Sequence, residues 1–251
     1  MLIIDVVLFG PIGISMWAVQ MIWIPFFAAG VINGVGHYCG YRNASLDDMS
    51  ANVSPLGILI GGEELHNNHH AFPTSAKLSA RWFEFDIGWA YIRCLEILRL
   101  ARAKRTIPVQ TFDFSKTIPD LASLQAIVTH RYLVLHEYAK KMWITGKSEL
   151  KILRSSHAEF SAKPAKQWWR LLWKDAAVLS DSERTEIQKL LNASSCLHTL
   201  YDFHRALQAL WARSHLSQEE SVVYLQTWCV NAQGSGIAPL ENFSRYLTRF
   251  S

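Results

Sequence analysis

"GGEELHNNHH", residues 61–70, places three histidines within five positions, directly behind two glutamates. If this stretch is helical, His66 shares one face with both His69 and His70, because residues three and four apart are neighbours on a helix surface. His69 and His70 then diverge by about 100° around the axis, so the helix offers imidazoles to two metal ions. Neutral imidazole is the commonest protein ligand for metals and suits iron, zinc, copper and nickel. The alternative is a solvated histidine-rich turn with the two asparagines at its polar tip; the surrounding sequence favours the metal site.

The segment ahead of this cluster is apolar. From Val6 to Tyr41 the chain contains no Asp, Glu, Lys or Arg. A membrane-spanning helix needs about 20 predominantly apolar residues, and residues 12–32 supply them, with Pro25 as a kink. The stretch is too long for the apolar core of a signal peptide. We therefore predict a transmembrane helix over residues 12–32; the alternative is a buried core helix of a soluble protein.

A group of basic residues follows the cluster. Basic residues close behind a span stay on the cytoplasmic side. The histidine cluster and everything after it are therefore predicted to lie on the cytoplasmic face of an integral membrane protein, in a cytoplasmic or inner membrane with lipid as a partner. Residues 85–101 have the pattern of an amphipathic helix lying along the membrane surface. The basic residues are Arg93, Arg99, Arg102, Lys104 and Arg105.

Composition narrows the function classes. Half of the residues are hydrophobic, and the net charge of +4 is concentrated behind the apolar segment. It is not spread as a nucleic-acid footprint, so no nucleic-acid partner is expected. The four cysteines form no C-x-x-C pair, which indicates reduced thiols rather than disulfides or a zinc site.

Two longer stretches carry a family resemblance. They are "GVINGVGHYCGYRN", residues 30–43, and "GGEELHNNHHAFPTSAKLSARWFEFDIGW", residues 61–89. Together they resemble the C-terminal half of integral-membrane acyl desaturases of the delta-9 type. In that family an N-x-x-x-H pair ends a transmembrane helix, "GYR" trails the lone histidine, and an H-x-x-H-H box follows one loop later. All three features occur here in that order, and the resemblance covers about residues 1–108.

The resemblance implies a di-iron site and its ligands. Asn33 would reach an iron directly or through a water, and its i, i+4 spacing to the lone histidine puts both on one helix face. Glu63 precedes the box by three residues and either accepts a hydrogen bond from a ligand's second ring nitrogen or is a simple helix-start charge. The implied iron ligands are His37, His66, His69 and His70.

The resemblance also implies a reaction. Desaturation removes two hydrogens from an unactivated methylene pair, which no side-chain acid or base can do, so iron must activate oxygen. Oxygen and two electrons would leave a double bond and water. The substrate would be an acyl chain linked to CoA, a lipid or a carrier protein. Nothing resembles a fused cytochrome b5 domain, so electrons would come from a separate donor protein. Two alternatives remain: a membrane-tethered helical interaction module without catalysis, and a related histidine-box membrane hydroxylase that yields an alcohol.

The number of ligands suggests an incomplete centre. Two irons need on the order of ten ligand positions, less any bridging or open sites, and the residues above supply about half. Desaturases of this type bring an H-x-x-x-x-H pair and another H-x-x-H-H box, and neither motif occurs here. We therefore expect an N-terminally truncated, inactive fragment whose Met1 is an internal or misassigned start.

The second half of the chain has a different character. Residues 106–120 form a linker by their prolines and mixed polarity. Ser180 and Ser217 each begin a capping box, Gly234 ends a helix, and Pro239 begins the last one. "LQTWCVNAQGSGIAPLENFSRYL", residues 225–247, resembles the C-terminal segment of insertion-sequence transposases, although no acidic triad or zinc finger accompanies it.

The predicted fold class is therefore all-α, with two domains. Residues 1–108 would be the C-terminal part of a membrane desaturase domain, with a transmembrane helix and interfacial helices. Residues 109–251 would be a soluble helical module, long enough for a small core of its own.

Overall fold

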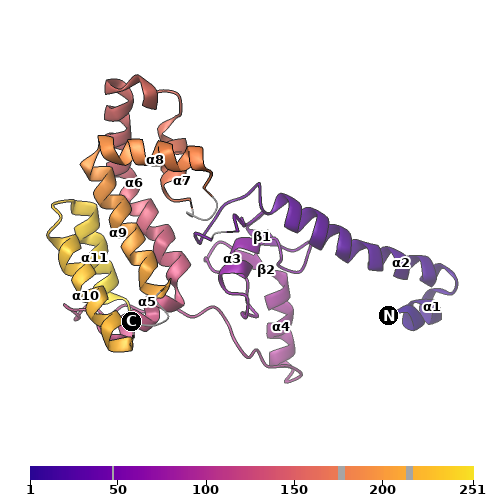
Figure 1. Cartoon of the computed structure of the whole chain (residues 1–251). Coiled ribbons are helices and arrows are strands. Elements are labelled where there is room, and N and C mark those ends of the chain that lie inside the picture. The colour runs from indigo at the N-terminus through magenta and orange to yellow at the C-terminus, as the bar shows by residue number, and fades with distance from the viewer. Residues whose placement is uncertain (47, 175–178, 213–216) are drawn as a thin grey trace. The chain divides into compact units, whose positions relative to one another are not determined.

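The computed structural model describes residues 1–46, 48–174, 179–212 and 217–251 (Figure 1). Its contacts divide the chain into two compact units, Met1–Ile107 and Pro108–Ser251. We call them the histidine unit and the helical unit, and describe each by itself. Most described residues are helical, as predicted, but the histidine unit also contains one pair of short strands.

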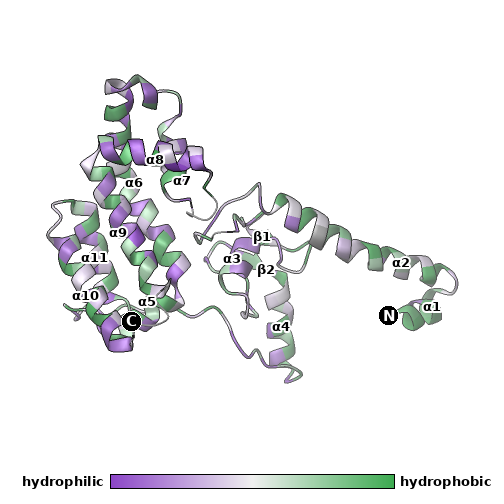
Figure 2. Cartoon of the chain, in the orientation of Figure 1, coloured by the Kyte–Doolittle hydropathy of each residue, from purple (hydrophilic) through white to green (hydrophobic). Residues whose placement is uncertain are grey.

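The histidine unit begins with apolar helices, coloured largely green in Figure 2. Helix α1 spans Leu2–Phe9, α2 spans Ile12–Pro25, and a π-helix, η1, spans Phe26–Val35. Gly10 turns the chain between α1 and α2 with a φ of 61°, a backbone conformation that glycine adopts at little cost. A Cβ at Gly13 would lie 2.2 Å from the carbonyl oxygen of Asp5. The two helices therefore pack backbone to backbone at this point.

The predicted transmembrane helix over residues 12–32 is not present as one α-helix. The α-helix ends at Pro25, and the next ten residues take the π conformation. Proline has no N–H to donate to the preceding turn, and π segments are rare and usually short. Within the described parts of the chain, no helix combines the length and the apolar character needed to cross a bilayer. The predicted integral-membrane location, with the histidine box on its cytoplasmic side, is therefore wrong.

The rest of the histidine unit is held together by short elements. Strand β1, Leu56–Gly57, pairs in parallel with β2, Phe85–Asp86. Helix α3 spans His66–Ala71 and α4 spans Ile87–Ile97, within the range predicted for an amphipathic helix. Asp86 links the start of α4 to the segment that follows α3, because one carboxylate oxygen accepts from Trp89 N at 2.9 Å as the cap of α4 and the other accepts from Leu78 N at 2.6 Å.

The helical unit follows the predicted start and stop signals. Ser180 and Ser217 form complete capping boxes with Glu183 and Glu220. Gly234 ends α10, and Pro239 lies in the first turn of α11. The helices are α5 Leu121–Thr129, α6 Arg131–Ser156, η2 Ala158–Phe160, α7 Ala165–Leu172, α8 Asp181–Ala193, α9 Ser195–Ala212, α10 Gln218–Gln233 and α11 Ala238–Arg249.

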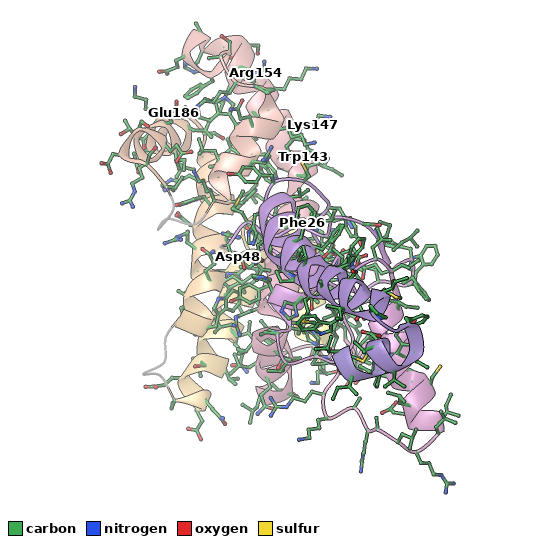
Figure 3. All side chains as sticks on the ribbon, turned by 90° about the vertical axis from the view of Figure 1, so that its right-hand side faces the viewer. Phe26, Asp48, Trp143, Lys147, Arg154 and Glu186 are labelled. Atoms are coloured by element: carbon green, nitrogen blue, oxygen red, sulfur yellow. The ribbon has the colours of Figure 1, made fainter. Side chains whose placement is uncertain are left out.

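Helix α6 lies at the centre of the helical unit and packs against α7, α9 and α11 (Figure 1). Tyr138 on α6 is fully buried and donates its hydroxyl hydrogen to Leu200 O at 2.7 Å. Gly146 lets the ring of Trp169 on α7 lie against the α6 backbone. Trp143 and Lys147, labelled in Figure 3, lie one turn apart, with Lys147 Nζ 5.9 Å from the Trp143 ring centroid. The core of this unit is thus aromatic and aliphatic.

Candidate metal centre

Three histidines converge in the histidine unit. His66 and His70 lie on one face of α3, as their i, i+4 spacing predicts, and His37 lies in the turn after η1. One ring nitrogen from each lies within 4.8 Å of those of the other two. The Nε2 atoms of His37 and His66 are 3.4 Å apart, and the His66 and His70 ring centroids are 4.3 Å apart. This arrangement can hold one metal ion.

The other predicted ligands lie outside this group. The His69 ring stacks on His66 at 6.3 Å between centroids, but its nitrogens do not join the three that converge. Asn33 is exposed in η1, and its side chain has no described hydrogen bond to an imidazole. Because η1 is a π-helix and His37 follows its end, the expected shared α-helical face does not form. Ligation by His69 and Asn33 stays a prediction.

The asparagines between the histidines are not a solvated tip, because both are buried. The carbonyl oxygen of the Asn67 side chain accepts from Asn43 N and Ala44 N, each at 2.8 Å. Its amide nitrogen donates to Ala44 O and Ser50 O, each at 3.1 Å. The side chain of Asn67 therefore ties α3 to the loop between residues 43 and 50.

Asn68 ties the same helix to a buried carboxylate. Its side-chain amide donates to Glu84 Oε2 at 2.9 Å. Glu84 Oε1 accepts from Tyr41 OH at 2.7 Å and from Asn43 Nδ2 at 2.6 Å. Burial, together with the hydrogen bond to Glu84 and its charge, raises the pKa of Tyr41 well above its usual value. A buried network whose members are all hydrogen-bonded rigidifies what it holds, here the helix that carries two of the three histidines.

The electrostatic setting keeps His66 neutral. Burial, reinforced by the neighbouring His70, His37 and His69, lowers the pKa of His66 to about 4. Metal ligation requires the neutral imidazole, so this ring is in its binding form at pH 7. His66 Nδ1 is also buried without a described hydrogen-bond partner. Three converging imidazole nitrogens fit a first-row transition metal such as iron.

Glu63 is the carboxylate that the sequence predicts beside the imidazoles, but a different carboxylate contacts them in the structure. Gly61 and Gly62 have φ values of 69° and 105°, so α3 begins only at His66 and Glu63 does not share its helical face. Asp48, labelled in Figure 3, contacts two of the three imidazoles instead. Its Asp-x-Ser pattern is typical of a turn closed by the aspartate side chain, and that signal could have drawn attention to it. The role of Glu63 stays a prediction.

Comparison with known proteins confirms both predicted resemblances. The chain is 36% identical to the sn-1 stearoyl-lipid 9-desaturase of Anabaena variabilis, over 34% of this chain and 32% of that relative. It is 44% identical to delta-9 acyl-lipid desaturase 1 of Arabidopsis thaliana, over 28% and 23% of the two chains. It is 38% identical to the sn-2 palmitoyl-lipid 9-desaturase of Nostoc sp. (strain 36), over 32% and 28%. The chain thus spans about a quarter to a third of the length of these relatives. No solved structure matches it.

The helical unit matches a different family. Residues 126–251, half of the chain, match the ISL3 family model described as transposase. The chain therefore belongs to this transposase family, and it also carries the motifs of the delta-9 desaturases in its histidine unit.

Proposed function

We propose that the histidine unit is the iron-binding part of an acyl desaturase. The observation that carries this proposal is the convergence of His37, His66 and His70, whose ligand nitrogens lie within 4.8 Å of one another. The similarity to lipid 9-desaturases supports it. The substrate would be an acyl chain linked to a lipid, CoA or a carrier protein, and a separate protein would donate electrons.

In this proposal the residues of the histidine unit bind the iron and fix the orientation of its ligands. His37, His66 and His70 hold iron through ring nitrogens, and the lowered pKa of His66 keeps protons from competing at that position. His69 and Asn33 are proposed as further ligands, and Glu63 as an acceptor for a ligand's second nitrogen. When bound, iron supplies the oxygen activation that oxidation of an unactivated methylene pair requires.

The geometry favours one ion for this chain on its own. A di-iron centre needs on the order of ten ligand positions, whereas three imidazoles converge here. We propose that the 251-residue chain binds a single iron with open positions and does not desaturate acyl chains without further ligands.

Metal titration tests the proposed centre. Cobalt(II), a spectroscopic stand-in for iron(II), should bind the wild-type chain at about one ion per chain, and iron(II) should do the same without oxygen. His66→Ala should abolish that binding. His157→Ala, which removes an exposed histidine from the helical unit, is the matched control and should bind like the wild type. Absence of binding in the wild type, or equal binding by His66→Ala, would refute the proposal.

A second function is proposed for the helical unit, because transposases act on DNA. A cavity of about 390 Å³ beside α11 is lined by two arginines, three aromatic residues and an asparagine: Arg245, Arg249, Phe112, Phe114, Tyr246 and Asn242. The Arg249 guanidinium lies 5.4 Å from the centroid of the Phe114 ring. Guanidinium groups bind phosphates and aromatic rings stack on bases. We propose that DNA contacts this surface. This proposal differs from the expectation, drawn from the charge distribution, that the chain has no nucleic-acid partner.

Fluorescence anisotropy with labelled single-stranded and duplex DNA tests this second function. The double variant Arg245→Gln/Arg249→Gln should bind several-fold more weakly and with a shallower salt dependence, since two phosphate contacts are lost. Lys189→Gln, which removes an exposed charge on α8, is the control. Equal affinities for the double variant and the wild type would contradict the assignment.

A further inference from the structure

One residue contacts two of the three converging imidazoles. The carbonyl oxygen of Asp48 lies 2.7 Å from His37 Nδ1. A carbonyl only accepts hydrogen bonds, so His37 Nδ1 carries the hydrogen. In a neutral imidazole the other nitrogen then keeps its lone pair. His37 Nε2, which lies 3.4 Å from His66 Nε2, is therefore the atom available to a metal.

The side chain of the same residue acts on the second imidazole. His70 Nδ1 is hydrogen-bonded to the carboxylate oxygen Oδ2 of Asp48. An ionised carboxylate also only accepts, so the hydrogen of His70 is fixed on Nδ1 and Nε2 keeps the lone pair. His66 differs, because its Nδ1 is buried without a described partner. Two of the three rings are thus oriented through Asp48 and the third through burial.

The backbone turn around Asp48 fixes the position of its carboxylate. The second carboxylate oxygen of Asp48 accepts from Ser50 N at 2.9 Å. Between them Met49 has a φ of 63°, the left-handed region. That conformation is unfavourable for a residue with a Cβ and persists only where the surrounding structure imposes it.

Two side chains impose that conformation. Arg42 donates from Nε to Ser50 O at 2.7 Å and from its terminal nitrogen to Leu46 O at 3.0 Å, so it clamps both ends of the turn. Asn67 on α3 donates to Ser50 O at 3.1 Å. The turn and the histidine helix therefore position each other.

The contacts argue against Asp48 as a ligand. The ligand atoms that converge come from three histidines, and the Asp48 carboxylate is not among them. It lies against the Nδ1 side of His70, whereas the free lone pair is on Nε2. A carboxylate behind a metal-binding histidine fixes the tautomer and ring orientation and raises the basicity of the ligand.

We propose that Asp48 is the positioning residue of this centre: its backbone carbonyl and its carboxylate hold His37 and His70 with Nε2 directed toward the metal. The proposal rests on the proposed iron-binding function. One turn thus orients two metal ligands that come from separate segments, His37 after η1 and His70 on α3.

Asp48→Ala removes the carboxylate but keeps the backbone carbonyl, which gives the test two readouts. Cobalt(II) affinity should fall roughly 10–100-fold, the usual effect of losing such a partner. In the metal-free chain, long-range nitrogen–proton NMR should show His37 still protonated on Nδ1, whereas His70 loses its Nδ1–H preference. A general loosening of the fold would change both rings.

Two further variants keep the test decisive. Asp48→Asn retains an uncharged acceptor of the same shape and should restore most of the His70 preference and part of the affinity. Asp113→Ala removes a second Asp-x-Ser turn, which belongs to the helical unit and in which Asp113 Oδ1 accepts from Ser115 N at 2.9 Å, and should change neither readout. Unchanged affinity and tautomer in Asp48→Ala would overturn the proposal. Failure of the wild type to bind metal would instead refute the proposed function, and the NMR readout in the metal-free chain would still decide the role of Asp48.

Discussion

The two units hold their interiors together in different ways. Around α3 of the histidine unit the buried residues are largely polar, among them Asn43, Asn52, Asn67, Asn68 and Glu84. In the helical unit they are leucines and aromatic rings. Apolar packing tolerates a changed side chain at a cost that scales with volume, whereas a buried hydrogen-bond network fails when one member leaves the others unpaired. The histidine unit should therefore be the more sensitive to single polar substitutions.

Glu84→Leu should give the largest effect. The carboxylate accepts six described hydrogen bonds, from the side chains of three asparagines and Tyr41 and from two backbone amides. Each buried donor left unpaired costs about 1–3 kcal/mol, so the histidine unit should lose its fold and its cobalt site. Peptide-resolved hydrogen exchange should show lost protection over residues 40–97 and normal protection in the helical unit. Thr74→Leu, at an exposed position of the histidine unit whose side chain has no described hydrogen bond, is the control; protection retained in Glu84→Leu would contradict the comparison.

The helical unit has its own sensitive polar residue, and acid should reveal it. His204 is buried against the rings of Trp173 and Tyr138, at 4.5 and 5.5 Å between centroids, and burial lowers its pKa to about 3. The unfolded chain binds a proton near pH 6.5, but the folded chain does not until about pH 3. Stability should therefore fall as the pH drops below 6.5, by about 1.4 kcal/mol per pH unit.

Urea unfolding at pH 7, 6 and 5 measures this loss, with exchange in α6 and α9 as the probe. His204→Leu should remove most of the slope, about 2 kcal/mol by pH 5. His198→Leu, at an exposed position on the same helix, should keep it. An unchanged slope in His204→Leu would show that other groups cause the acid sensitivity.

Overpacking the contact between α6 and α7 should lower stability less than Glu84→Leu or the protonation of His204. A Cβ at Gly146 would lie 1.9 Å from the Trp169 ring, so Gly146→Ala must push α7 away from α6. Such overpacking costs about 1–3 kcal/mol, partly offset by the better helix propensity of alanine, about 1 kcal/mol. The net loss should appear as a lower urea midpoint of the helical unit. At Gly234 an added Cβ would meet its nearest atom at 3.7 Å, so Gly234→Ala should leave the midpoint nearly unchanged; a similar loss in both would count against packing as the cause.

The same contrast explains what the sequence could predict. The capping boxes at Ser180 and Ser217, the stop at Gly234 and the start at Pro239 were all predicted correctly, because each signal and its structural effect lie within one turn of helix. The shared face of His66 and His70 is local in the same sense.

The histidine unit depends on contacts that no local pattern encodes. Tyr41 and Glu84 are 43 positions apart, and nothing in their spacing predicts that they meet. Asp48 was missed because its partners, His37 and His70, lie 11 and 22 positions away. The membrane span was predicted from apolar character alone, which does not register that the α-helix ends at Pro25.

Removing a helix cap should lower the stability of the helical unit less than overpacking or acid does. In the box at Ser180, Glu183 N donates to the serine hydroxyl at 3.3 Å and the glutamate accepts from Ser180 N at 2.9 Å. Ser180→Ala should cost about 1 kcal/mol, and so should Ser217→Ala, whose box has the same geometry. The two caps share no described hydrogen-bond partner, so the double variant should lose about the sum. A loss well above the sum in urea unfolding would show that the two helix starts are coupled.

Expressing the helical unit without the histidine unit should not change its stability, provided the fragment keeps the backbone hydrogen bonds between residues 111–113 and the C-terminus. Residues just after the division pair with the last residues of the chain: Asp113 N donates to Arg249 O at 2.7 Å and Ser251 N to Thr111 O at 3.1 Å. Phe112 also contacts the ring of Phe250, which is fully buried, at 5.2 Å between centroids. Residues 108–251 expressed alone should therefore give a helical circular-dichroism spectrum and the urea midpoint that the helical unit shows in the whole chain.

Residues 118–251 lack these pairings and should unfold at a lower midpoint, because a buried aromatic contact is worth about 0.5–1.5 kcal/mol beyond its area. Equal midpoints for the two fragments would show that the segment before α5 contributes nothing to the fold. A disordered spectrum for residues 108–251 would show that the helical unit needs the histidine unit, and the two could then no longer be treated as separately folded.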